Sequence, residues 1–124
     1  MSEKPTVEIP DGPPSYRLEL EDVVVGEGEE AVAGRLVEMH YVGVSWKTGR
    51  QFDASWDRGG TFKFGLGKGQ VIPGWDRGVE GMRVGGRRKL TIPSAMAYGA
   101  RGAGGGVIKP HEPLVFVVDL LAVE

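Results

Sequence analysis

Glycine placement constrains the fold of this sequence more than any other feature. The chain has 21 glycines among 124 residues, well above the average usage of about 7%. They follow no fixed period and fall between short apolar runs. This spacing is typical of strands joined by tight turns, and it excludes a fibrous repeat.

Alternating apolar residues predict five or six strands. Near the start, Tyr16, Leu18 and Leu20 alternate with charged residues and predict a half-buried strand. The run RLVEMHYVGVSW is rich in β-forming residues, and KTG (47–49) predicts a hairpin turn after it. TFKFGLG and RRKLTIP predict further strands. The last run, LVFVVDLLAVE, is apolar at both sets of alternate positions, which predicts a central strand.

One segment, VIPGWDRGVEGM (71–82), has helical periodicity. Pro73 suits the first helical position because its missing N–H would have no partner there. Trp75, Val79 and Met82 recur at i, i+4 and i+7, which places them on one face. The segment therefore predicts a short helix of about two turns with one buried stripe.

Glycines weaken this helix, since each costs roughly 0.5–1 kcal/mol relative to alanine. We therefore expect its stability to come from the sheet that packs against it. We expect Gly74, Gly78 and Gly81 to permit close backbone approach and a tight exit. The predicted fold class is α+β, with an antiparallel sheet of five or six strands curved around one short helix.

The chain has the length of one domain and divides at residue 16. Residues 1–15 contain four prolines and predict an extended, loosely held arm, whereas residues 16–124 form the domain. The N-terminal residues do not resemble a signal peptide, and no run approaches the roughly 20 apolar residues of a membrane span, so we expect a cytoplasmic protein. The net charge of −2 predicts no nucleic-acid or membrane partner. A monomer is the default expectation.

The sequence has few residues that carry covalent or metal chemistry. Cysteine is absent, and His40 and His111 are about seventy residues apart, a spacing that matches no metal motif. We expect His40 to be a hydrogen-bonded strand residue and His111 a turn residue. The glycine runs GAGGG and GLGKGQ lack the context of phosphate-binding loops. We therefore expect no metal and no cofactor.

Six aromatic residues come from six separate segments: Tyr41, Phe52, Phe62, Trp75, Tyr98 and Phe116. Such a set often forms only a core, but two details favour a binding cleft. Two members are tyrosines, whose hydroxyls need partners when buried. Asp53 directly follows Phe52 and adds a carboxylate. An apolar pocket with a few polar groups is the usual small-molecule or peptide site.

The motifs of the domain resemble a known family. In chain order they are HYVG, G-x-x-FD-x-S, F-x-F-x-LG, VIPGWDRGVEGM-x-VG, YG and L-V-F-x-V-x-L. Through them, the chain from about Tyr16 to Glu124 strongly resembles the FKBP-type peptidyl-prolyl cis-trans isomerases, as a small single-domain bacterial-type member. The resemblance implies a half-barrel sheet around one short helix, and an enzyme that assists folding by rotating X–Pro bonds.

The resemblance also implies a hydrophobic cleft between helix and sheet. The residues implied as catalytic are Tyr41, Phe52, Asp53, Trp75 and Tyr98. Those implied as substrate-binding are Phe62, Val71, Ile72, Ile108 and Phe116. Trp75 is expected to form the floor, with its ring facing the cleft, and Arg58 is expected to pair with Asp53 or Tyr41. No metal is implied.

The implied ligands are proline-containing peptides and unfolded proteins, together with the macrolide immunosuppressants that many members bind. Two alternatives remain open: a macrolide- or protein-binding module with little turnover, and a chaperone that holds unfolded chains. The sequence departs from the better-known members at the glycine-rich flap around Ala103 and Gly104, at Met96, and at Lys109 before Pro110.

Overall fold

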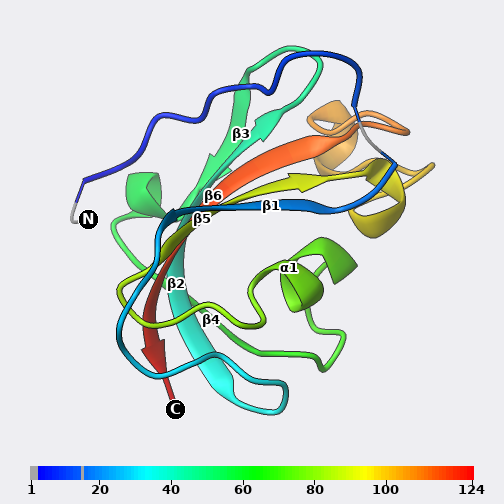
Figure 1. The fold of residues 1–124 in the computed structure, drawn as a ribbon. Helices are drawn as coiled ribbons and strands as arrows, with labels where there is room; N and C mark the ends of the chain where they lie inside the picture. The colour runs from blue at the N-terminus through cyan, green and yellow to red at the C-terminus, as the bar shows by residue number, and fades with distance from the viewer. Residues whose placement is uncertain (1–2, 15) are drawn as a thin grey trace.

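The computed structural model describes residues 3–14 and 16–124. Six strands form one antiparallel sheet: β1 (Glu19–Val24), β2 (Leu36–Ser45), β3 (Gln51–Ala54), β4 (Phe62–Gly65), β5 (Arg87–Ile92) and β6 (Leu114–Val123). Their order is β1-β5-β6-β2-β3, and β4 also pairs with β2. Within the described ranges, α1 (Pro73–Gly78) is the one α-helix, and it lies in the hollow of the curved sheet (Figure 1). The predicted α+β class is therefore confirmed.

The long strand β6 lies at the centre of the sheet, between β5 and β2. Its residues from Leu114 to Leu120 are all buried, which confirms the prediction of a central strand. One alternate set, including Phe116 and Val118, belongs to the core that contains α1. The other set, including Val117 and Asp119, is buried on the opposite face.

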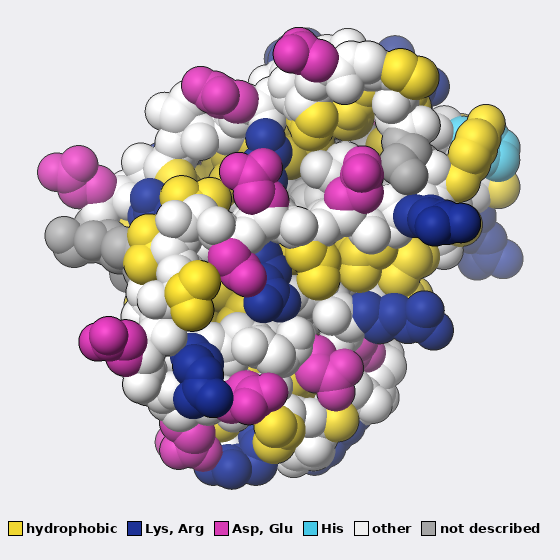
Figure 2. All heavy atoms as spheres, viewed as in Figure 1, with side chains coloured by type: hydrophobic (Ala, Val, Ile, Leu, Met, Phe, Trp, Pro, Cys, Tyr) yellow, Lys and Arg dark blue, Asp and Glu magenta, His cyan; other side chains and the backbone are white. Residues whose placement is uncertain are grey.

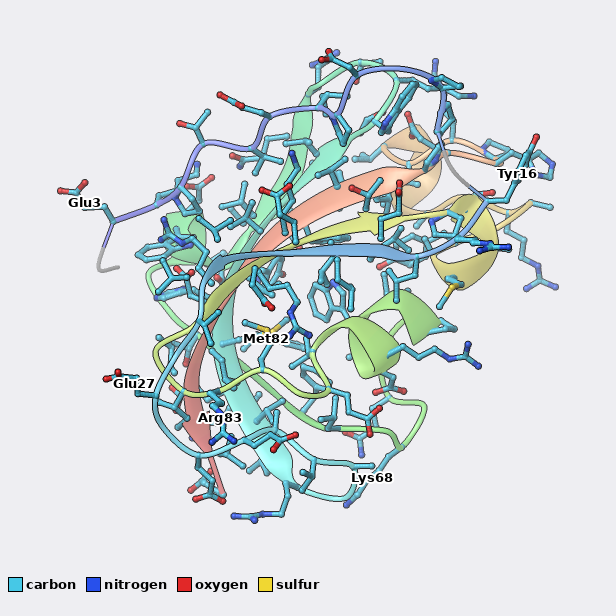
Figure 3. The ribbon with its side chains drawn as sticks, in the orientation of Figure 1. Glu3, Tyr16, Glu27, Lys68, Met82 and Arg83 are labelled. Atoms are coloured by element: carbon cyan, nitrogen blue, oxygen red, sulfur yellow. The ribbon has the colours of Figure 1, made fainter. Side chains whose placement is uncertain are left out.

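The helix begins at Pro73 and has six residues, in agreement with the predicted two turns, but it does not include all of the predicted stripe. It ends at Gly78, and Val79 is its C-cap, so Met82 lies beyond it. The chain then turns back toward the segment before β2, because Gly81 N–H donates to Ala31 O and Ala31 N–H donates to Met82 O. Trp75, Val79 and Met82 are nevertheless all buried, as the periodicity predicted. In Figure 3 the labelled Met82 points into the interior beside α1.

Two of the glycines let α1 approach the sheet closely. A Cβ built on Gly74 would lie 2.6 Å from Ile92 Cδ1, and one built on Gly78 would lie 2.9 Å from Leu90 Cδ1. Gly81 acts differently, since its φ of +89° belongs to the left-handed region and a Cβ there would meet open space. The expected close approach is therefore made by Gly74 and Gly78, and the expected tight exit by Gly81.

The prediction of a half-buried first strand is wrong. Strand β1 starts at Glu19, and all six of its residues are exposed. Tyr16 precedes the strand and is 98% exposed, so its side chain extends away from the molecule (Figure 3). The reason is that β1 is an edge strand, paired on one side with β5. Leu18 is the residue of this run that packs against the core.

Residues 3–14 contain no helix or strand and cross the outer face of the sheet, opposite α1 (Figure 1). Lys4 Nζ lies 2.8 Å from Asp57 Oδ1, and Arg87 Nη2 donates to Glu3 O at 3.1 Å. The arm therefore lies against the sheet through specific contacts rather than hanging loosely from it. Residues 1, 2 and 15 of the predicted arm lie outside the described residues.

Charged side chains of both signs are interspersed on the face shown in Figure 2, with apolar side chains between them. This mixture agrees with the small net charge of the chain, which is −2. Among residues 3–14 and 16–124, no helix has the length and hydrophobicity that a membrane crossing requires.

Candidate active site in an aromatic cleft

A cavity of about 270 Å³ opens between α1 and the sheet. Its walls come from β2, β3, β4, β6, the segment before α1, and the loop after β5. The lining residues are Tyr41, Phe52, Asp53, Phe62, Gln70, Val71, Ile72, Trp75, Tyr98 and Phe116. All five residues predicted as catalytic, and four of the five predicted as substrate-binding, therefore meet at one cavity.

Ile108 is the predicted site residue that the cavity does not include. It is buried in the hydrophobic core and pairs with Ala103 through two backbone hydrogen bonds at the base of the glycine-rich loop. Its side chain therefore helps to hold that loop to the core, in the same buried cluster as Trp75 and Phe116.

The ring of Trp75 forms the floor on which the other aromatic rings converge. It lies 4.8 Å from the Tyr41 ring, 5.6 Å from Phe62 and 5.2 Å from Phe116, each in an edge-to-face arrangement. Such pairs are favourable beyond their buried area. Trp75 lines the cavity but is only 7% exposed, and its Nε1 is buried without a hydrogen-bond partner among the described residues. The ring thus serves both the core and the cleft.

Phe52 closes the opposite wall. Its ring stands edge-to-face on Phe116, with centroids 5.5 Å apart. Gly43 makes this contact possible, because a Cβ there would lie 2.6 Å from the Phe116 ring and 2.7 Å from the Phe52 ring. A glycine in the middle of β2 therefore gives the two rings their space.

A polar network occupies the rim of the cleft. The Tyr41 hydroxyl donates to Asp53 Oδ2 at 2.6 Å and accepts from Arg58 Nη2 at 2.6 Å. Arg58 Nη1 also donates to Asp53 Oδ1. The expected pairing of Arg58 is confirmed with both partners. The carboxylate and the phenol are thereby held in one orientation at the edge of an apolar pocket.

The short 3-10 helix η1 (Ser55–Arg58) brings Arg58 to this network. Its first residue, Ser55, is fully buried, and its Oγ accepts a 2.7 Å hydrogen bond from Tyr41 N–H. The same hydroxyl lies 2.8 Å from His40 Nδ1, and the His40 ring stacks on Trp56 at 4.0 Å. His40 is therefore a hydrogen-bonded strand residue, as predicted, and it helps to lock η1 against β2.

Both cleft tyrosines have a raised pKa. Burial is the main cause for Tyr41, and the hydrogen bond to Asp53 adds to it, while the bond from Arg58 opposes it. For Tyr98, burial raises the pKa and the negative charge of Asp53 raises it further. Both phenols are therefore protonated at neutral pH. The Tyr98 hydroxyl has no hydrogen-bond partner within the described part of the chain.

Gln70 is a lining residue that the sequence reasoning missed. Its Oε1 accepts from Gly65 N–H at 2.8 Å, which ties the end of β4 to the segment before α1. Asp76 braces the same turn by accepting from Gly67 N–H and Gly69 N–H. The sequence signal is the run GLGKGQ, whose closely spaced glycines indicate a tight turn that Gln70 ends.

Metal ligands do not gather at the cleft. In the described ranges, no three Asp, Glu or His side chains approach closely enough to hold a metal ion. His111 has a φ of 59° and donates its N–H to Gly99 O, so it is a turn residue, as predicted.

An antiparallel sheet curved around one short helix, with an aromatic cavity between them, agrees with the class of protein that the motifs indicated. The family model described as FKBP-type peptidyl-prolyl cis-trans isomerase matches residues 27–121, so the chain belongs to that family. The prediction that the protein is a peptidyl-prolyl cis-trans isomerase is therefore confirmed.

Individual relatives agree with the assignment. The chain is 58% identical over 121 residues to an FK506-binding protein of Streptomyces anulatus, covering 98% of both chains. It is 47% identical over 108 residues to a peptidyl-prolyl cis-trans isomerase of Saccharomyces cerevisiae, covering 87% of this chain and 76% of the relative. The crystal structure of AtFKBP13 matches with a TM-score of 0.79 at 43% identity, covering 86% of this chain and 93% of that one.

Proposed function

We propose that the aromatic cleft accelerates cis–trans isomerisation of X–Pro bonds by holding the prolyl ring against Trp75. The observation that carries the proposal is that nine of the ten residues expected at the site line one cavity of about 270 Å³. Trp75 supplies its floor, Phe62 and Phe116 its apolar walls, and Tyr98 and Asp53 its polar rim.

Loss of amide resonance accounts for the barrier of about 18–20 kcal/mol to rotation. The planar amide is more charge-separated than the twisted one, so a dry aromatic cleft disfavours the planar form relative to the twisted form. A site that binds the twisted conformer better than either planar conformer is catalytic by differential binding. Each ~1.4 kcal/mol of this preference gives about a tenfold rate increase.

The polar groups at the rim orient the peptide. In this proposal, the Tyr98 hydroxyl or the Ile72 N–H donates to a substrate carbonyl. Asp53 is held by Tyr41 and Arg58 and contributes a local field, but it takes no proton from the substrate. This arrangement needs no nucleophile and no proton transfer.

Isomerisation of an X–Pro peptide, followed by NMR exchange, tests the proposal. We expect acceleration by the wild type, a strong loss in Phe52→Ala, and a loss of about twofold to tenfold in Tyr98→Phe, as one hydrogen bond predicts. Tyr16→Phe is the matched control, because Tyr16 is exposed away from the cleft. Failure of the wild type to accelerate the peptide would contradict the proposal.

A macrolide is a second proposed ligand of the cleft, since relatives are named FK506-binding proteins. Adding FK506 should change the fluorescence of Trp75, and the change should disappear in Trp75→Phe, which leaves Trp46 and Trp56 as emitters. Tight macrolide binding without turnover would favour the binding-module alternative. Suppression of aggregation by a variant inactive on peptides would favour the chaperone alternative.

We also propose proline-containing peptides and unfolded proteins as partners, a monomeric state and a cytoplasmic location. Light scattering after size-exclusion chromatography tests the monomeric state, for which the expected mass is that of one chain, 13.3 kDa. Fractionation of cells that express the protein tests the compartment.

A further inference from the structure

A second cavity adjoins the aromatic cleft, and Phe52 lines both. It has a volume of about 390 Å³ and lies between the β2–β3 turn and the glycine-rich loop before β6. Its remaining lining residues are Ser45, Thr48, Arg50, Gln51, Gly105, Gly106, Val107, Lys109 and Glu112. The two cavities thus share one aromatic wall.

Glu112 builds the inner side of this second cavity. It is 5% exposed, and its two carboxylate oxygens accept hydrogen bonds from the Ser45 hydroxyl and, at 2.9 Å, from Lys109 N–H. A buried carboxylate is stable when hydrogen bonds satisfy it. Because both oxygens already have donors from the chain, Glu112 ties the loop to the end of β2 and keeps the cavity shaped.

Two cations at this cavity have no partner among the described residues. Within residues 3–14 and 16–124, neither the Arg50 guanidinium nor the Lys109 ammonium makes a hydrogen bond or an ion pair. Arg58 at the neighbouring cleft differs from both, because it forms an ion pair with Asp53. Both free side chains are exposed, so they can reach a ligand at the mouth of the cavity.

The glycine-rich loop leaves this side of the cavity open. Gly105 and Gly106 line it with φ values of +64° and +106°, and a Cβ built on either would meet nothing within 4 Å. A bulkier loop could fill this space, whereas two glycines leave it for a ligand.

We propose that this cavity is a substrate subsite that takes an acidic side chain of a residue next to the proline. The inference rests on the proposed function, which seats the prolyl ring against Trp75 on the other side of Phe52. A chain that leaves the cleft past Phe52 brings its next side chain to Arg50 and Lys109. Their two positive charges outnumber the single Glu112 carboxylate, which Ser45 and the Lys109 N–H already bind on the inner side. The mouth of the cavity therefore favours glutamate or aspartate over lysine, since opposite charges attract and like charges repel.

Matched peptides that differ only in the residue before or after proline test the subsite, with Glu, Gln or Lys at that position. At low salt we expect kcat/KM for the Glu peptide to exceed that for the Gln peptide by about threefold to tenfold at one of the two positions. The ratio should fall as salt is added, because salt screens exposed charges. The Lys peptide should be the poorest substrate.

The double variant Arg50→Gln, Lys109→Gln should bring the Glu/Gln ratio close to one. The matched control is Lys63→Gln, Arg77→Gln, which removes the same charge from exposed residues that line neither cavity and should keep the ratio. Equal use of the three peptides, a preference for lysine, or a ratio that survives the double variant would each overturn the subsite.

Peptide binding, measured by NMR chemical-shift titration, separates the two proposals. Tighter binding of the Glu peptide without acceleration of any peptide would support the subsite and contradict the isomerase mechanism. Acceleration of all three peptides with equal binding would support the mechanism and overturn the subsite.

Discussion

The Tyr41 hydroxyl donates a 2.6 Å hydrogen bond to Asp53 Oδ2, from one strand of the sheet to its neighbour across the rim of the cleft. Arg58 completes a triangle by donating to both groups. This arrangement explains how a partly exposed carboxylate can keep one orientation beside an apolar pocket. It also links the stability of the protein to the protonation of a tyrosine.

Alkaline pH should destabilise the protein partly through Tyr41. The pKa of Tyr41 in the folded protein is raised above the ordinary value of 10.0. In the pH range between the unfolded and the folded pKa, Tyr41 is therefore protonated more often in the folded protein than in the unfolded chain. The free energy of unfolding therefore falls as pH rises through about 10. Tyr41→Phe should be less stable than the wild type at pH 7, because it loses the hydrogen bond. Between pH 10 and 11, however, its free energy of unfolding should fall less than that of the wild type.

Urea unfolding between pH 7 and 11 measures this effect. Tyr16→Phe is the control, because its ring is exposed and lies outside the network. Equal slopes of stability against pH for Tyr41→Phe and the wild type would show that Tyr41 is not the linked group.

Substituting Gly74 should test how tightly α1 packs on the sheet. A Cβ at this position would lie within 3 Å of three Ile92 side-chain atoms, and Ile92 is fully buried and stiff at χ1. Gly74→Ala should cost about 1–2 kcal/mol, since overpacking outweighs the gain in helix propensity. Gly60→Ala is the control, because a Cβ there meets open space. A Gly74→Ala variant as stable as the control in urea would contradict the packing.

The ion pair between Arg87 and Asp119 should matter more than the pair between Lys4 and Asp57. Asp119 is 1% exposed and receives two hydrogen bonds from Arg87, at 2.6 and 2.8 Å, whereas both members of the second pair are exposed. Arg87→Met should cost about 3–5 kcal/mol, because it leaves a buried charge without a partner.

Lys4→Met should cost about 1 kcal/mol or less, as is usual for exposed pairs. Thermal and urea unfolding of the two variants provide the comparison. Similar losses of stability in the two variants would mean that burial does not determine how much these ion pairs stabilise the protein.

Removing residues 1–15 should leave an active domain of lower stability. The described part of the arm contributes half-buried side chains, among them Val7 and Ile9, and contacts Arg87 and Asp57 from the face opposite the cleft. We therefore expect a lower urea midpoint with kcat/KM for an X–Pro peptide nearly unchanged. A shortened chain that does not fold would contradict the predicted domain boundary at residue 16.

Local patterns predicted much of this fold because strand alternation and turn chemistry act over a few residues. The hairpin turn at Gly49 and the central strand β6 followed directly from such patterns. Most of the cleft followed from the order of the motifs, since each motif carries its own aromatic or polar residue to a defined place in the sheet.

The features that local sequence patterns could not predict depend on contacts between residues far apart in the sequence. Strand β1 has the alternation of a half-buried strand, but its exposure follows from its position at the edge of the sheet. Ile108 lies in a loop expected to cover the cleft; it pairs with Ala103 through two backbone hydrogen bonds and packs into the hydrophobic core, and it is not among the residues that line the cavity.

The sequence by itself determined the elements of this protein, its turns and the family to which it belongs, because these depend on neighbouring residues and on motif order. The tertiary structure alone decided that Trp75 serves both core and cleft, that Arg58 bonds Tyr41 and Asp53 at the same time, and that Glu112 forms the inner side of a second cavity. Each of these depends on the meeting of segments from different parts of the chain, and such meetings are set by the packing of the whole domain rather than by any local run.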